Sequence, residues 1–348
     1  MFLSGKKIGV LFAALTAAFV SMQSCNKEFD DIGEVETLKP MQTAGDLIET
    51  DGSFSILKAA VTKAGLWDVL KNPGNNLTVF APDDAALTAS GISMAAVDAL
   101  PAGQLQSLLQ YHVIAQALPA EQISTDFPNV QMPTLLPLLQ TNPLAKLSIF
   151  PSRRNSSLFV NNIPVTEADI VVENGIVHKV AGVVAPPSQL VAQIIGADSD
   201  LSLFRAAVAR ADSGQTGLNR LDSVMKYGLA NVTVFVPNNA AVQQLLIALG
   251  LPPSEMAFQF LPVQTVRGIV AYHMLGSRAF SVNLPATTST IQTLIGASPF
   301  PQLTVDRSTA LPRLLGAGNG AQYANFVATD RHGVNGVVHV IDVVLRPQ

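Results

Sequence analysis

The sequence has few charged residues, few aromatic residues and one cysteine. Only 13% of its 348 residues are charged and 48% are hydrophobic, which is typical of packed cores and argues against a disordered chain. The formal net charge of −4 comes without a basic stripe, so we do not expect nucleic acid as a partner. A single cysteine cannot form a disulfide within the chain, and stability must therefore come from the cores.

The common enzyme signatures are also missing. The sequence contains no G-x-S-x-G nucleophile elbow, no H-E-x-x-H helix and no glycine loop for phosphate. No two histidines stand at a close spacing such as H-x-x-x-H, so the pattern indicates no metal site. We therefore expect a protein that is not an enzyme, without catalytic, metal-binding or cofactor-binding residues.

What the sequence does contain is a motif that occurs twice. Residues 174–180 read NGIVHKV, and residues 335–341 read NGVVHVI. We interpret each copy as a tight turn, in which Asn-Gly accepts positive φ angles, followed by a buried strand that carries one histidine. The structural residues of the motif are Asn174, Gly175, His178, Asn335, Gly336 and His339.

Two further marks precede each copy in the same order. The pairs Tyr111-His112 and Tyr272-His273 lie at one spacing from the motif, since 178 − 112 = 66 and 339 − 273 = 66. Further upstream, residues 77–86 (LTVFAPDDAA) match residues 232–241 (VTVFVPNNAA). Three ordered marks, each found twice, indicate an internal duplication.

Together these marks resemble the fasciclin domain family, present twice. The resemblance implies an α+β fold of two tandem fasciclin-like domains, each a small wedge-like β-sheet core with several helices, expected at residues 45–187 and 188–348. In animal members the region around Tyr-His is linked with adhesion to receptors, which would make Tyr111, His112, Tyr272 and His273 candidate interaction residues. From the residues alone, the same four side chains are better explained as buried structural groups.

Three local expectations bear on possible sites. Asp83 and its counterpart Asn238 are expected to cap helices rather than to bind a ligand. Residues 111–114 (YHVI) are expected to form a strand after a helix at residues 102–110. His332, which has no counterpart in the first copy, is expected in an exposed polar turn at residues 330–333.

The amino terminus resembles the export signal of a bacterial lipoprotein. Lys6 and Lys7 precede an apolar run at residues 8–20, whose 13 residues (20 − 8 + 1) are fewer than the about 20 that span a membrane. Residues 21–25 (SMQSC) resemble a lipobox, which implies that residues 1–24 are removed as a signal peptide and that Cys25 is lipidated. Residues 25–44 are then expected to be a flexible tether.

These features favour a non-enzymatic cell-envelope lipoprotein that mediates adhesion or scaffolding by binding protein or polysaccharide. We expect it to be anchored in the bacterial outer membrane by its N-terminal lipid, on the cell surface or facing the periplasm. An alternative is a glycan-capture accessory lipoprotein of a nutrient-uptake system, although one Trp and four Tyr offer few platforms for sugar stacking. A hydrolase is a third possibility, and it would need a catalytic pair assembled across loops.

Overall fold

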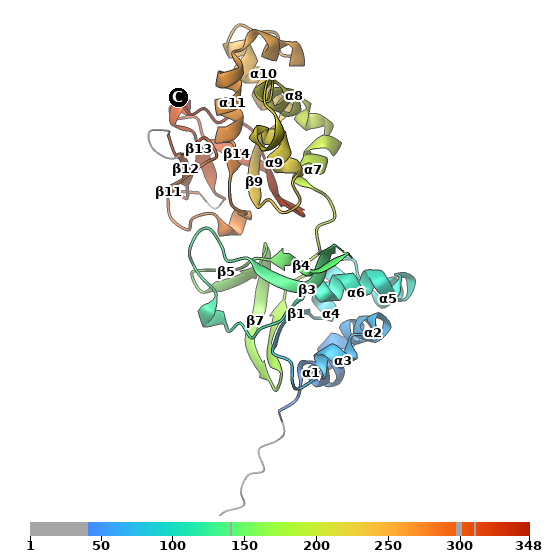
Figure 1. Cartoon of the computed structure of the whole chain (residues 1–348). Coiled ribbons are helices and arrows are strands. Elements are labelled where there is room, and N and C mark those ends of the chain that lie inside the picture. The colour runs from blue at the N-terminus through green and yellow to red at the C-terminus, as the bar shows by residue number, and fades with distance from the viewer. Residues whose placement is uncertain (1–40, 140, 297–300, 310) are drawn as a thin grey trace, which may run out of the picture. The chain divides into compact units, whose positions relative to one another are not determined.

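The computed structural model describes residues 41–348, except residue 140, residues 297–300 and residue 310 (Figure 1). The expected signal peptide, the lipidation site Cys25 and most of the expected tether lie outside these described residues. Residues 42–348 form a compact unit. Across the described ranges, no helix combines the length and the apolar character needed to cross a membrane.

The first copy is built on a sheet with the strand order β4-β3-β2-β1-β8-β7-β6-β5. Strand β1 pairs in parallel with β8, and all other neighbours are antiparallel. The strands are β1 (Leu77–Pro82), β2 (Val113–Ile114), β3 (Met132–Leu139), β4 (Asn142–Ile149), β5 (Pro151–Arg154), β6 (Ser157–Val160), β7 (Ile163–Val172) and β8 (Gly175–Val180).

Helices cover one face of this sheet, as Figure 1 shows for α2 and α6. They are α1 (Ala44–Thr50), α2 (Ser55–Ala64), α3 (Trp67–Leu70), α4 (Asp84–Ala89), α5 (Met94–Ala99) and α6 (Ala102–Tyr111), with 3-10 turns η1 (Gly52–Phe54) and η2 (Ala120–Gln122). Leu77, Val79 and Ala81 of β1 pack against the helices, whereas Phe80 packs on the opposite side. Because both faces of β1 are buried, the strand is hydrophobic almost throughout.

The second copy repeats this arrangement with the strand order β10-β9-β15-β14-β13-β12-β11. Its parallel pair, β9 with β15, has the register of β1 with β8. The strands are β9 (Val232–Pro237), β10 (Met274–Leu275), β11 (Ser289–Ile291), β12 (Leu303–Asp306), β13 (Arg313–Leu315), β14 (Ala324–Gly333) and β15 (Gly336–Ile341). The helices are α7 (Val191–Ala197), α8 (Ser202–Ala211), α9 (Leu221–Lys226), α10 (Asn239–Ala248) and α11 (Val263–Tyr272), with 3-10 turns η3 (Ser199–Leu201), η4 (Gly217–Asn219), η5 (Glu255–Phe260), η6 (Ser281–Asn283) and η7 (Ala317–Asn319).

Several boundaries differ from those expected. Helix α1 starts at Ala44 and is capped by Thr43, so it overlaps the end of the expected tether. The strand predicted at residues 111–114 is wrong in its first half, because Tyr111 ends helix α6 and His112 caps it. The predicted helix caps are confirmed, since the side chains of Asp83 and Asn238 both accept a hydrogen bond from the first turn of the following helix.

Candidate functional site

The asparagine of each duplicated motif ties three segments of its copy together. Asn174 Oδ1 accepts from Ala44 N at 2.8 Å, at the start of α1. Its Nδ2 donates to Leu70 O at 2.8 Å and to Asn72 O at 3.1 Å, at the end of α3. The same three bonds recur around Asn335, with Val191 N, Met225 O and Tyr227 O as partners. Both asparagines are buried, so these amides act as internal crosslinks.

The glycine of the motif is required chiefly by close packing of the backbone. A Cβ on Gly175 would lie 1.9 Å from Leu77 O, and one on Gly336 would lie 2.2 Å from Val232 O. The prediction of positive φ angles for Asn-Gly is right only for Gly175, at 137°; the described backbone has negative φ at both asparagines and at Gly336. The parallel neighbour strand therefore explains both glycines better than turn geometry does.

The histidine of each motif strand is buried and bonded through both ring nitrogens. His178 Nδ1 accepts from Asp169 N at 3.1 Å, and its Nε2 donates to Leu118 O at 3.0 Å. Its ring stacks on Phe80 with centroids 5.5 Å apart. His339 has the same environment, formed by Asp330 N, Ala279 O and Phe235. Burial lowers the pKa of both imidazoles, so both are neutral at pH 7.

The histidine of each Tyr-His pair has the opposite tautomer. His112 Nδ1 donates to Leu108 O at 2.8 Å, within helix α6, and its Nε2 accepts from Val184 N at 2.9 Å. His273 does the same with Ile269 O and Leu345 N. Burial lowers the pKa of both histidines to about 4. Each ring therefore fixes the end of a helix to the segment that follows the motif strand.

The tyrosines of the pairs are fully buried, and their hydroxyl groups are bonded. Tyr111 Oη donates to Ser148 O at 2.8 Å, and Tyr272 Oη donates to Gln302 O at the same distance. Burial raises the pKa of Tyr111 to about 12 and also raises that of Tyr272. The four candidate interaction residues are each at most 3% exposed, so their side chains lie inside the two copies.

The expectation for His332 is wrong. This residue lies in strand β14 rather than in an exposed turn, and it is half-buried. Arg278 Nη1 donates to its Nε2 at 2.9 Å, and Phe280 contacts the ring edge-on. Burial lowers the pKa of His332 well below its usual value, and the positive charge of Arg278 is the second, smaller cause. Because Arg278 is 54 positions away in the sequence, local context could not reveal this pairing.

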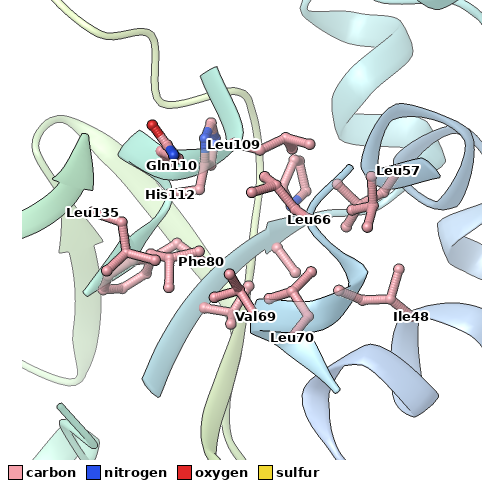
Figure 2. A pocket seen from close by; sticks show the side chains of 15 residues that line it. Ile48, Leu57, Leu66, Val69, Leu70, Phe80, Leu109, Gln110, His112 and Leu135 are labelled. Carbon is pink, nitrogen blue, oxygen red and sulfur yellow. The ribbon is translucent and has the colours of Figure 1, made fainter. Parts of the chain in front are cut away.

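Each copy contains an apolar cavity between its helices and its central strand. Figure 2 shows the first, where Leu57, Leu66 and Leu109 surround a space with His112 and Gln110 at one side. Its volume is about 20 Å³, whereas the equivalent cavity beside His273 measures about 70 Å³. The nitrogens of both histidines are already bonded, so these cavities have no free imidazole to offer a polar ligand.

In the part of the chain that the structure describes, no three His, Cys, Asp or Glu side chains gather closely enough to hold a metal ion.

Large apolar side chains are exposed at the end of α10 and on η5. They are Ile247, Leu249, Met256 and Phe260, exposed by 54 to 68%. We call these four residues the α10–η5 patch. No sequence motif pointed to the α10–η5 patch, although residues 246–260 are rich in apolar residues for a segment with a Pro-Pro turn.

Comparisons with known proteins agree with this duplicated architecture. The chain is 31% identical over 227 residues to transforming growth factor-beta-induced protein ig-h3 of Sus scrofa, which covers 62% of this chain and 31% of that protein. It thus spans about a third of the length of that relative. It is 26% identical over 320 residues to the fasciclin-like arabinogalactan protein CTB11 of Cercospora beticola, covering 88% of this chain and 77% of that protein.

Among solved structures, a FAS1 domain pair from the insect cell adhesion molecule Fasciclin I is similar over 86% of this chain and 95% of that chain. The identity is 16% and the TM-score is 0.36. The Fasciclin domain family itself matches residues 52–186 and 199–347, and each match contains one full set of the duplicated marks. The chain therefore belongs to the fasciclin domain family and contains two tandem fasciclin domains of α+β fold.

Proposed function

We propose that the chain is a cell-envelope lipoprotein that mediates adhesion or scaffolding by binding a partner at its surface. The fasciclin domain fits a non-enzymatic, adhesion-like role. The observation that carries the proposal is the use of the duplicated polar groups. The four histidines and two asparagines of the marks are buried and hydrogen-bonded inside their own copies. We therefore place the recognition of a partner on surface residues that differ between the two copies.

The α10–η5 patch is such a surface. Exposed apolar side chains on two consecutive elements favour a protein partner, because burying them removes apolar area from water. In the first copy, the segment after the corresponding helix α4 is shorter, and Met94 is its most exposed large apolar residue, at 42%. The second domain therefore offers the stronger candidate for protein contact.

The proposed anchor is tested by metabolic labelling. Cells that express the full chain are grown with a palmitate analogue, and the purified chain is examined for the label. We expect label on the wild-type chain and none on Cys25→Ser. Biotinylation of intact cells with a membrane-impermeant reagent then reports whether the chain lies on the outer face. A wild-type chain without lipid would refute the anchor.

The proposed binding role is tested by crosslinking the lipidated chain in intact envelopes and isolating what is attached. We expect capture that saturates and that falls when Met256 and Phe260 are both replaced by Ser. The matched control is Leu144→Ser, which removes a 91% exposed apolar side chain from the first copy. Equal loss in the control, or capture that never saturates, would contradict the role assigned to the patch.

A further inference from the structure

The second domain has a pocket whose lining differs from the equivalent positions of the first domain. This pocket lies among helices α7, α8 and α9 and has a volume of about 280 Å³. Its wall is apolar, formed in part by Ile195, Val208 and Met225, and charged residues line the rest. A volume near the lower end of small-molecule sites, about 300 Å³, suits a ligand of one ring.

The motif asparagines give the alignment between the domains. Asn174 binds the carbonyls of residues 70 and 72, and Asn335 binds those of residues 225 and 227. The offset is thus 225 − 70 = 155, which places Asp222 at the position of Trp67. Helices α2 and α8 are both ten residues long, and Thr62 and Ala209 are each third from the end.

In the first domain, Trp67 and Thr62 stand at these two positions and contact each other. The indole Nε1 of Trp67 donates to Thr62 Oγ1 at 3.1 Å, and Lys71 Nζ lies 5.1 Å from the ring centroid. The second domain replaces the indole by the short side chain of Asp222 and the threonine by Ala209. Two residues of the pocket lining thus stand at the positions that Trp67 and Thr62 have in the first domain.

The charged side chains of the pocket are mainly positive. The lining contains three cations, Arg205, Arg220 and Lys226, and one carboxylate, that of Asp222. Its formal charge is therefore 3 − 1 = +2, in a chain of net charge −4. Arg205 Nη1 donates to two main-chain carbonyls, which fixes its position. Arg220 approaches Asp222 only to 3.6 Å, while Lys226 pairs with Asp222 at 2.8 Å.

Asp212 also lies near this group, 3.9 Å from Arg220. Its carboxylate is already committed, because Arg267 Nη1 donates to it at 3.2 Å and Leu221 N and Asp222 N donate at 2.8 and 2.9 Å. Arg220 thus contacts carboxylates of the protein only at long distances, 3.6 and 3.9 Å. An anion that enters the pocket can replace these long contacts with short, charge-assisted hydrogen bonds.

We propose that this pocket binds a carboxylate carried on a six-membered ring. The face of the ring would lie on the apolar wall, where the indole lies in the first domain, and the carboxylate would point to Arg205, Arg220 and Lys226. Two sources share this chemistry: a free aromatic acid and a uronate residue of an acidic polysaccharide. The site stands independently of the α10–η5 patch, so failure of either leaves the other unaffected.

The test is isothermal titration of the soluble chain, residues 26–348, at low salt. One arm uses benzoate and indole-3-acetate, the other uses galacturonate and its trimer, and the neutral controls are indole and galactose. We expect saturable heat from the acids in at least one arm, and none from the neutral compounds. Heat in the aromatic arm alone identifies a free small molecule, and heat in the uronate arm alone identifies a polysaccharide residue. No heat in either arm, or equal binding of neutral compounds, overturns the proposal.

Two variants locate the site. Installing the first domain's pair, by Ala209→Thr with Asp222→Trp, should fill the pocket and abolish binding. Arg220→Gln keeps the pocket open and should weaken binding by roughly tenfold, as expected for loss of a charge-assisted bond. Lys71→Gln in the first domain is the matched control and should leave the affinity unchanged. Thermal unfolding checks that each chain is folded, and if the double variant is not, Arg220→Gln decides. Unchanged affinity in a folded pocket variant overturns the assignment.

Discussion

Removing the Asn174 amide should destabilise the first domain more than its single polar side chain suggests. Asn174→Ala deletes three hydrogen bonds, to Ala44 N, Leu70 O and Asn72 O, of which the first two are buried. Each bond contributes about 1 kcal/mol net, and a buried partner left unpaired costs more, so the expected loss is about 3 to 4 kcal/mol. With a urea dependence of about 2 kcal/mol per molar, the unfolding midpoint should fall by about 1.5 to 2 M.

The assay is urea unfolding of residues 26–348, followed by the fluorescence of Trp67. Because Trp67 is the only tryptophan of the chain and lies in helix α3, its signal reports the first domain. The control is Asn76→Ala, since Asn76 is exposed and should shift the midpoint only slightly. A shift of less than about 1 kcal/mol for Asn174→Ala would refute the crosslinking role.

Three further predictions concern the glycines, the buried histidines and a helix cap. Gly175→Ala should unfold the first domain or destabilise it severely, because its Cβ would meet Leu77 O at 1.9 Å, whereas Gly103→Ala in helix α6 meets nothing and should stabilise by about 0.5 to 1 kcal/mol in the same urea assay. The folded pKa of His112 and His273 is about 4, below the unfolded value of 6.5, so the unfolded chain binds more protons between these two pH values. The free energy of unfolding should therefore have its full contribution from each histidine above pH 6.5 and lose about 3 kcal/mol per histidine as the pH drops to 4. Calorimetry at a series of pH values measures this loss. Asp83→Ala removes the bond from Ala86 N and should cost about 1 kcal/mol in urea unfolding, and no change would contradict the cap.

The duplicated marks could be predicted from the sequence because their signals are local or periodic. Strand β1 is an unbroken apolar run that ends at a proline, and Asp83 follows at the cap position of a helix. The equal spacing of the histidines indicated that whatever holds one copy holds the other. The structure adds that His112 donates through Nδ1 and His178 through Nε2, which spacing alone does not determine.

Other features depended on residues far apart in the sequence. The roles of Asn174 and Gly175 come from contacts with residues about a hundred positions upstream, so local turn propensity gave an incomplete reason for both. His332 stood among polar residues in the sequence, yet Arg278 and Phe280 enclose it. The pocket of the second domain follows from Asp222, which the asparagine contacts align with Trp67 of the first domain.

The most direct test measures the protonation of the duplicated histidines, because we infer that they stabilise the fold and that binding takes place at the surface. Long-range ¹H–¹⁵N correlation spectra of the ¹⁵N-labelled chain at pH 7 report the charge and tautomer of each ring. We predict four neutral imidazoles, with the proton on Nδ1 in His112 and His273 and on Nε2 in His178 and His339. Rings that titrate near pH 6.5, or that shift when Zn²⁺ is added, would contradict it.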